Sequence, residues 1–105
     1  MRILLVEDDR SLSRAVSTIL QKNNYSVDCV ENGQMALDYL EKDIYDAVIM
    51  DIMMPEMDGI ATARKIRERV GEDVTIIILT SFDFSEIEEE ARAAGVNAFM
   101  AKPLF

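Results

Sequence analysis

The residue in this sequence best placed to do chemistry is an aspartate at the end of an apolar run. Asp51 follows the apolar residues 47–50, Glu7 and Asp8 follow an earlier apolar run, and Lys102 comes just after a later one. In an open parallel α/β sheet, ligands and reacting groups gather at the carboxyl ends of the strands. The sequence therefore predicts that three acids and one lysine meet at one edge of a sheet.

The three acids would repel one another at close range unless a cation lay between them. Mg²⁺ suits such a place, because it takes about six oxygen ligands and keeps several of them as water. Asp9 belongs to the same acidic run, and composition alone does not decide which of Glu7, Asp8 and Asp9 bind metal. The alternative role for Asp9 is that of an acid at a helix N-terminus, where the helix dipole favours negative charge.

The elements that would position these residues follow a repeated βα pattern. Apolar, β-rich runs alternate with segments of helical periodicity, which predicts an α/β fold with a parallel sheet. Continuous apolar runs suit central strands covered on both faces, whereas the mixed run at 27–30 suits an edge. The runs cover residues 3–6, 27–30, 47–50, 74–79 and 98–100.

Between these runs, apolar residues recur at helical spacing and define the faces expected to point inward. The fourth helix is expected to begin near Ser85, whose hydroxyl would cap Glu88 in a Ser-x-x-Glu box. Gly71 and Gly95 are expected to end the third and fourth helices. The inward faces are Leu12, Ala15, Val16, Ile19 and Leu20; Ala36, Leu37 and Leu40 after Gly33; Ile60, Ala63 and Ile66; and Ile87, Ala91 and Ala94.

Composition narrows the class of protein. A chain of 105 residues, half of them hydrophobic and 30% charged, predicts one globular domain with a single core. A net charge of -9 argues against direct binding to nucleic acid, and no apolar run approaches the length of a membrane helix. The chain has no histidine, so any phosphohistidine must come from a partner.

Cysteine usage and the start of the chain indicate the compartment. Cys29 is the only cysteine, which excludes an intrachain disulfide, and it is interpreted as a small core residue. The first residues do not form a secretory signal. A cytoplasmic protein is expected.

Four motifs, in order and spacing, resemble those of receiver domains of bacterial two-component signalling, and the resemblance covers essentially the whole chain. It implies a flavodoxin-like, doubly wound, five-stranded parallel sheet of strand order 2-1-3-4-5. It also implies a phosphoryl-accepting switch, which takes its phosphoryl group from a histidine kinase or phosphotransfer domain and is read by an effector domain or output protein. The motifs are Ile3-Leu4-Leu5-Val6-Glu7-Asp8; Asp51 followed by Ile52 and Met53-Met54-Pro55-Glu56-Met57-Asp58-Gly59; Leu79-Thr80-Ser81; and Phe99-Met100-Ala101-Lys102-Pro103.

The resemblance also assigns roles at the site. Asp51 is the nucleophile and phosphoacceptor, and Mg²⁺ or Mn²⁺ is the cofactor. The implied metal ligands are Asp8, Asp51 and the backbone carbonyl of Met53, with Glu7 bound through water. Lys102 neutralises a phosphoryl oxygen.

Further roles concern the shape of the site and its switching. The Lys102-Pro103 peptide is expected to be cis. Thr80 is expected to donate to the phosphoryl group and Phe99 to follow it inward, a population shift for which ordinary core packing of Phe99 is the alternative. Met53 and Phe82 occupy positions that in receivers influence how the attacking water is placed, and both are apolar here, which predicts slow autodephosphorylation.

Receivers continue past the Lys-Pro pair into a fifth helix, which this sequence does not contain. The expectation is a C-terminally incomplete domain over 1–105, with an apolar sheet face that could support a homodimer. The halves also resemble different subgroups: the residues up to about Gly59 resemble receivers of DNA-binding regulators, and those from Thr80 onward resemble receivers of hybrid kinases. A recombined or engineered receiver therefore stays open as an interpretation.

Two other classes of function compete with this one. A pseudo-receiver would keep the fold as a binding module without phosphorylation, but the set Glu7, Asp8, Asp51, Thr80 and Lys102 is intact. A phosphatase of the haloacid dehalogenase type needs a second acid two residues after its nucleophile, where this chain has methionine. No turnover of an external substrate is expected, although a receiver catalyses its own phosphorylation and dephosphorylation.

Overall fold

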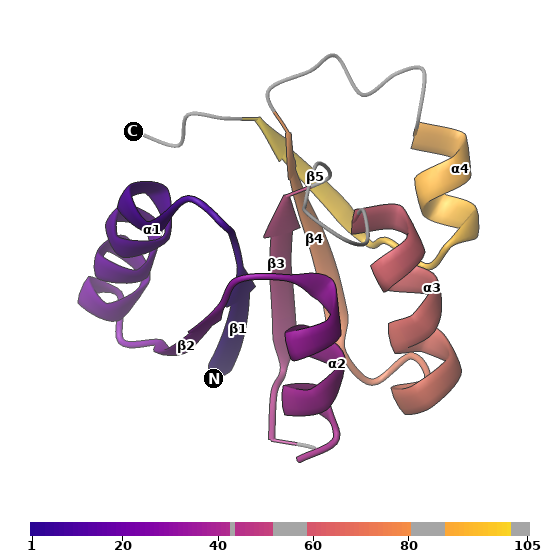
Figure 1. The fold of residues 1–105 in the computed structure, drawn as a ribbon, viewed down its shortest axis with the longest axis horizontal. Coiled ribbons are helices and arrows are strands. Elements are labelled where there is room, and N and C mark those ends of the chain that lie inside the picture. Colours follow the sequence, from indigo (N-terminus) through magenta and orange to yellow (C-terminus); the bar gives the residue numbers. More distant parts are fainter. Residues whose placement is uncertain (43, 52–58, 81–87, 102–105) are drawn as a thin grey trace.

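The computed structural model describes residues 1–42, 44–51, 59–80 and 88–101, with residues 51, 80 and 101 described by their backbone alone. Strands and helices alternate along these residues (Figure 1). The elements are β1 (Arg2–Val6), α1 (Arg10–Lys22), β2 (Ser26–Val30), α2 (Gly33–Leu40), β3 (Ala47–Asp51), α3 (Gly59–Val70), β4 (Thr75–Thr80), α4 (Glu88–Ala93) and β5 (Ala98–Ala101). The βα alternation expected from the sequence is confirmed.

The strands form one parallel sheet in the order β2-β1-β3-β4-β5. This is the flavodoxin-like order implied by the resemblance, so the predicted fold class is confirmed. The central strands carry continuous apolar runs, at residues 3–6, 47–50 and 76–79, because both of their faces are covered, as in other parallel sheets. The mixed strand β2 lies at an edge, as predicted.

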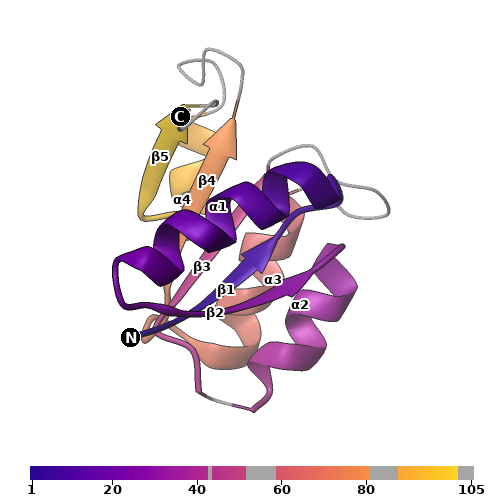
Figure 2. The same ribbon diagram turned by 90° about the vertical axis from the view of Figure 1, so that its left-hand side faces the viewer.

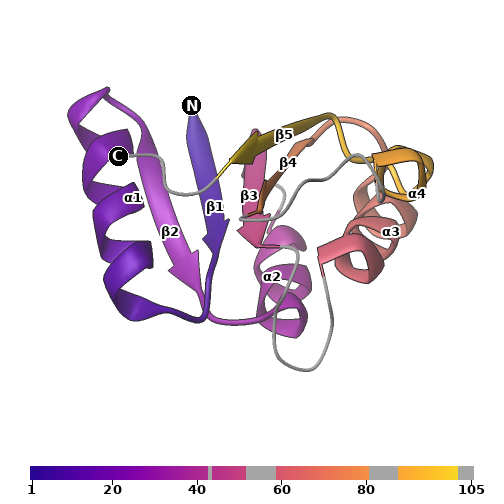
Figure 3. The same ribbon diagram turned by 90° about the horizontal axis from the view of Figure 1, so that it is seen from above.

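Helices cover the two faces of the sheet unequally. Among the described residues, α2, α3 and α4 lie on one side of the sheet and α1 is the only helix on the other (Figures 1 and 3). The larger core packs under the three helices, and its fully buried members include Leu4, Leu37, Val48, Ile66 and Ile78. The smaller core under α1 contains Ile3, Leu5, Val16, Ala47, Ile49 and Leu79.

The predicted inward faces of α2, α3 and α4 are confirmed wherever the structure describes them. Each of the apolar residues expected to be inward in these helices is at most 8% exposed. Ser85 and Ile87 lie outside the described residues, so the predicted capping box is not tested. The confirmed set is Ala36, Leu37, Leu40, Ile60, Ala63, Ile66, Ala91 and Ala94.

The predicted inward face of α1 is only partly correct. Val16 is 2% exposed, but Ile19 is 39% exposed and the expectation that it is buried is wrong. The reason is tertiary, because α1 has no neighbouring helix on its side of the sheet among the described residues. Figure 2 looks at this side and shows β5 with no helix in front of it.

An apolar groove lies beside α1 as a result. Its volume is about 410 Å³, and its lining includes Ile3, Ile19, Ile49, Ile77 and Met100. Met100 is 39% exposed, unlike the buried residues under α2 and α3. We call this surface the α1-side groove.

Gly71 and Gly95 end α3 and α4 as predicted, and both have positive φ angles, of 68° and 101°. Arg67 of α3 joins these two ends, because its guanidinium donates to the carbonyl oxygens of Gly71 at 2.8 Å and of Gly95 at 2.8 and 3.0 Å. The same side chain donates to the carbonyl of Val74 and to Oδ1 of Asn97, each at 2.6 Å. Charge-assisted bonds of this kind are stronger than bonds between neutral groups.

Cys29 is exposed, which corrects its interpretation as a small core residue. It lies in the edge strand β2, opposite Leu5 of β1. Its side chain lines a surface pocket with Ser13 and Ser17 of α1. The alternation of the strand directs Cys29 to the side of α1, and at the edge of the sheet this side is open to solvent.

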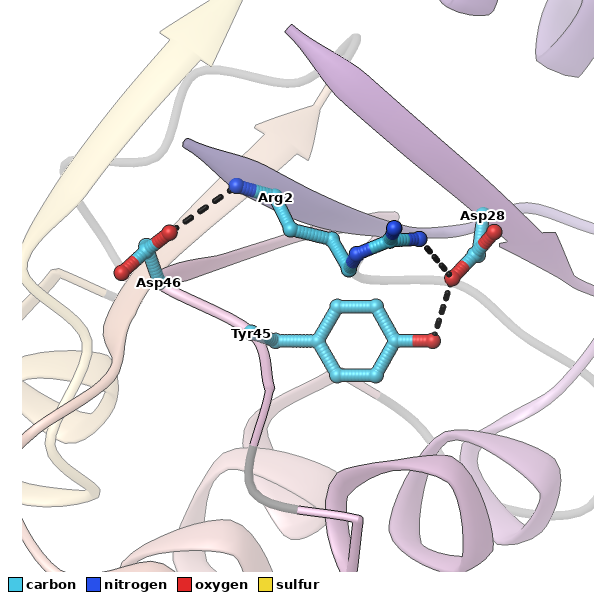
Figure 4. A network of polar contacts seen from close by, with 4 residues as sticks. All are labelled: Arg2, Asp28, Tyr45 and Asp46. Atoms are coloured by element: carbon cyan, nitrogen blue, oxygen red, sulfur yellow. Dashed lines mark hydrogen bonds and ion pairs between the residues drawn. The ribbon is translucent and has the colours of Figure 1, made fainter.

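A polar network secures the amino-terminal edge of the sheet, away from the strand ends that carry the acids (Figure 4). Oδ2 of Asp28 accepts from the Tyr45 hydroxyl at 2.6 Å and from Nη1 of Arg2 at 3.1 Å. The backbone N–H of Arg2 donates to Asp46 at 2.9 Å. The bond from Tyr45, followed by the contacts with Arg2, lowers the pKa of Asp28, whereas burial and the Asp28 carboxylate raise that of Tyr45.

This network predicts a dependence of stability on pH. The pKa of Asp28 in the folded state lies below its ordinary value of 3.8, so the stabilisation is fully present above that pH. It is lost as the pH falls through the lower, folded-state pKa. Asp28→Asn should therefore give a smaller loss of unfolding free energy between pH 6 and pH 2.5 than the parent chain, measured by urea unfolding at each pH.

A second variant for this prediction is Tyr45→Phe, which keeps the buried ring and removes the hydroxyl that has the largest effect on the pKa of Asp28. It should reduce the dependence on pH in the same direction. Equal slopes for the parent and both variants would contradict the role assigned to Asp28.

Candidate functional site

The acids of the candidate site lie where β1 and β3 end side by side. The strands are parallel, so their carboxyl ends meet at one edge, and Val6 of β1 is opposite Met50 of β3. The next residues on these strands are Glu7 and Asp51. In the sheet, β2 lies on one side of β1 and β3 on the other, so the direction of the connections reverses at β1. Such a topological switch point is where α/β proteins bind ligands.

The backbone of Thr80 lies near the same edge, one strand further along. Asp51 is opposite Leu79 of β4, and Thr80 follows Leu79 and is opposite Ala101 of β5. The structure thus brings the backbones of Asp51 and Thr80 to adjacent strand ends. Their side chains, and the whole of Lys102, Pro103, Met53 and Phe82, lie outside the described residues, so the cis peptide and the roles of these residues stay predictions.

Glu7 is a buried acid of the candidate site. It is 4% exposed, and its backbone N–H donates to the carbonyl of Val30 at 3.0 Å. Its Oε1 accepts from the backbone N–H of Asp9 at 3.3 Å. A buried carboxylate is costly unless hydrogen bonds or a cation compensate it, so this placement is typical of a functional group. Asp8, the next residue, is exposed.

Asp9 has the capping role that the sequence left open. Its Oδ1 accepts from the backbone N–H groups of Ser11 at 2.9 Å and Leu12 at 3.2 Å, which makes it the N-cap of α1. A carboxylate so used satisfies N–H groups that have no partner within the helix. Asp9 thus has a structural role at the start of α1, whereas metal binding by Glu7 and Asp8 stays a prediction.

The donor chemistry at this edge fits a hard divalent cation. Among residues with described side chains, no three of the types His, Cys, Asp and Glu cluster closely enough to hold a metal, but the set predicted here includes Asp51, whose side chain is outside that description. Glu7 and Asp8 follow β1 directly, next to the strand that ends at Asp51, and both residues carry carboxylate oxygens. Oxygen ligands of this kind are those that Mg²⁺ takes.

Phe99 lies in β5 opposite Ile78 and packs, half-buried, against the larger core. The guanidinium carbon of Arg92 in α4 lies 5.5 Å from the centre of its ring. Sequence reasoning named Phe99 but missed Arg92. The spacing of Glu88 and Arg92 places an acid and a base one helical turn apart, which signals their ion pair but not the contact with Phe99.

The comparisons with known proteins agree with this fold. The family model described as the response regulator receiver domain matches residues 3–104. Response regulator MprA of Mycolicibacterium vanbaalenii is 37% identical over 103 residues, which are 98% of this chain and 44% of that protein. The chain belongs to the response regulator receiver domain family, and it spans less than half the length of the curated relatives it matches.

Solved structures show the same architecture. The chemotaxis protein CheY4 of Vibrio cholerae superposes with a TM-score of 0.94 at 30% identity, over 99% of this chain and 88% of that one. The receiver domain of sensor histidine kinase PA1611 from Pseudomonas aeruginosa superposes with a TM-score of 0.88 at 35% identity, over 99% and 86%. That structure has a magnesium ion coordinated in its active site cleft.

In the part of the chain that the structure describes, no helix is both long enough and apolar enough to cross a bilayer.

The different roles of Asp8 and Asp9 can be separated by mutation. Asp9→Ala should lower the free energy of unfolding by about 1 kcal/mol, as loss of an N-cap does, and leave Mg²⁺ affinity within about twofold. Asp8→Asn should weaken Mg²⁺ binding by about tenfold or more, because an anionic ligand is lost. Titration calorimetry and urea unfolding measure the two effects.

Glu72→Gln is a control for loss of one negative charge, since Glu72 is exposed and lies between α3 and the start of β4. It should change Mg²⁺ affinity little. If Asp9→Ala weakened Mg²⁺ binding as much as Asp8→Asn, the assignment of the two acids would be wrong.

Proposed function

We propose that this domain is a phosphoryl-accepting signalling switch with Asp51 as the acceptor. The observation that carries the proposal is the register of β1 and β3, which puts the buried Glu7 level with Asp51 at the switch point of the sheet. An oxygen of the Asp51 carboxylate attacks phosphorus, and the P–N bond of a partner's phosphohistidine breaks. The imidazole leaves with the electron pair of that bond and takes up a proton.

The other site residues act on charge and position. Asp8, Asp51 and the Met53 carbonyl would hold Mg²⁺ or Mn²⁺, with Glu7 acting through water. The cation, when bound, neutralises negative charge on the phosphoryl oxygens. Lys102 supplies a further positive charge to one of these oxygens from the segment after β5.

The signal is a change between two arrangements of the same chain. Thr80 donates to a phosphoryl oxygen, and Phe99 follows it inward, so that the modified state alters partner binding at the surface of α4 and β5. The phosphoryl group has this effect because it stabilises one arrangement more than the other. Met53 and Phe82 make autodephosphorylation slow.

The expected partners follow from the chain's composition and family. A histidine kinase or phosphotransfer domain supplies the phosphoryl group, since the chain has no histidine of its own. An effector domain or output protein reads the switch, in the cytoplasm. No direct contact with nucleic acid or membrane is expected of a domain with net charge -9.

The proposal is tested by the intact mass of the protein after incubation with Mg²⁺ and a small acyl-phosphate donor. One added phosphoryl group is expected. Asp51→Asn should show no addition, because an amide is not a nucleophile at this step, and omission of Mg²⁺ should also prevent it.

Asp46→Asn is the matched control for that experiment, because Asp46 directly precedes β3, at the end of that strand opposite to Asp51, and accepts a hydrogen bond from the backbone N–H of Arg2. It should be phosphorylated like the parent. A folded parent chain that gained no mass would favour the pseudo-receiver, in which the fold serves binding alone.

The α1-side groove favours self-association of the 105-residue chain, so we propose a homodimer through this face as an additional state. Met1, Ile19, Tyr25 and Met100 are all at least 38% exposed and line the groove. Contiguous apolar surface of this kind marks an interaction site more often than isolated apolar residues do.

Ile19→Glu should shift the chain towards monomer in sedimentation velocity at high concentration, since it places a charge on the groove. Ile44→Glu is the matched control, because Ile44 is also exposed, at 49%, and does not line the groove. A parent chain that sediments as a monomer at every concentration would rule out the dimer.

A further inference from the structure

The contact between Arg92 and Phe99 joins the last turn of α4 to the edge strand β5. The guanidinium carbon lies 5.5 Å from the ring centroid, within the range in which a cation is attracted to an aromatic face. Phe99 is the only residue of the proposed switch whose side chain the structure describes. Arg92 contacts this residue from outside the core.

The ring of Phe99 has two different surroundings. Towards the sheet it packs against the larger core, beside Ile78 in the neighbouring strand. Towards α4 it meets the charged side chain of Arg92, which is itself 54% exposed. The half-buried position of the ring thus combines core packing on one side with a cation on the other.

Glu88 fixes the orientation of Arg92. Its Oε1 accepts from Nε of Arg92 at 3.3 Å and from Nη2 at 3.2 Å, across one turn of α4. An acid four residues before a base is the favourable direction for such a pair in a helix. Two bonds to the planar guanidinium restrict its rotation, which lowers the entropy cost of keeping it against the ring.

We propose that Arg92 is a positioning residue that stabilises Phe99 in the half-buried arrangement and so opposes the switch. This inference rests on the proposed function, because it concerns the regulation of the same site. Moving the ring further inward breaks the contact with Arg92. Binding of the phosphoryl group must offset the free energy of the lost contact. The contact therefore reduces the fraction of unmodified molecules that have the ring in the inward arrangement.

The size of the effect follows from the kind of contact. A cation–π contact at an exposed site changes an equilibrium by about two- to fivefold. Apparent affinity for a ligand of the modified arrangement changes by the same factor when that arrangement is the minor one. Simple electrostatics predicts the opposite sign, because removal of a positive charge weakens binding of an anionic group.

The test uses the 105-residue chain with saturating Mg²⁺ and beryllofluoride, a tetrahedral mimic of a phosphoryl group on a carboxylate. Arg92→Gln should bind beryllofluoride about two- to fivefold more tightly than the parent, and Arg92→Lys should stay closer to the parent. In a Phe99→Leu background, Arg92→Gln should have no effect, since the ring is absent. The NMR resonances of the Phe99 ring in the free protein should shift in Arg92→Gln.

Arg64→Gln is the matched control, because it removes the same charge from an ion pair with Glu90 of α4 and its side chain is 55% exposed. It should not tighten binding. Unchanged or weaker binding by Arg92→Gln, the same tightening by Arg64→Gln, or unshifted ring resonances would each overturn the inference.

The outcome for the parent chain separates this inference from the proposed function. If the parent binds no beryllofluoride in Mg²⁺, both are overturned. If the parent binds and Arg92→Gln binds equally well, only the role of Arg92 is overturned.

Discussion

The register between β1 and β3 is the constraint on which the candidate site depends. Along the sequence, α1, β2 and α2 lie between these two strands, yet Val6 is opposite Met50 in the sheet. Glu7 and Asp51, the next residues, therefore lie at the same level of the sheet. A shift of one residue in a parallel pair would turn one set of buried side chains to the opposite face. Burial of apolar residues on both faces of β1 and β3 therefore also fixes the placement of the acids.

That register is reinforced at the two ends of the sheet by different means. At the amino-terminal edge, Arg2 and Tyr45 bond to Asp28, which ties β1 and the segment before β3 to the edge strand β2 (Figure 4). At the carboxyl edge, Asp9 caps α1 directly after the acids, so the helix begins where the site requires the chain to leave the sheet. The stabilising contacts are thus adjacent to the site but use other carboxylates.

The two faces of the sheet differ in how completely the described helices cover them. α2 and α3 pack over the larger core, and Arg67 bonds the end of α3 to the end of α4. α4 in turn reaches β5 through Arg92 and Phe99. These contacts form a continuous path from the core to the surface next to the switch residues, whereas the opposite side carries the apolar groove beside α1.

The sequence by itself determined the class of fold, the strand order through the family resemblance, and the inward faces of α2, α3 and α4, because local periodicity and motif spacing encode them. It also located Glu7, Asp8, Asp51, Thr80 and Phe99 at strand ends or in strands. It did not decide whether Asp9 binds metal or caps a helix, since an N-cap is identified by hydrogen bonds from the first N–H groups of the helix to its side-chain oxygen. It misplaced Ile19 and Cys29, because exposure at the edge of a layer depends on which neighbours are present. The contact of Arg92 with Phe99 was likewise decided by tertiary structure, since nothing local in the chain specifies which ring a solvent-exposed guanidinium will meet.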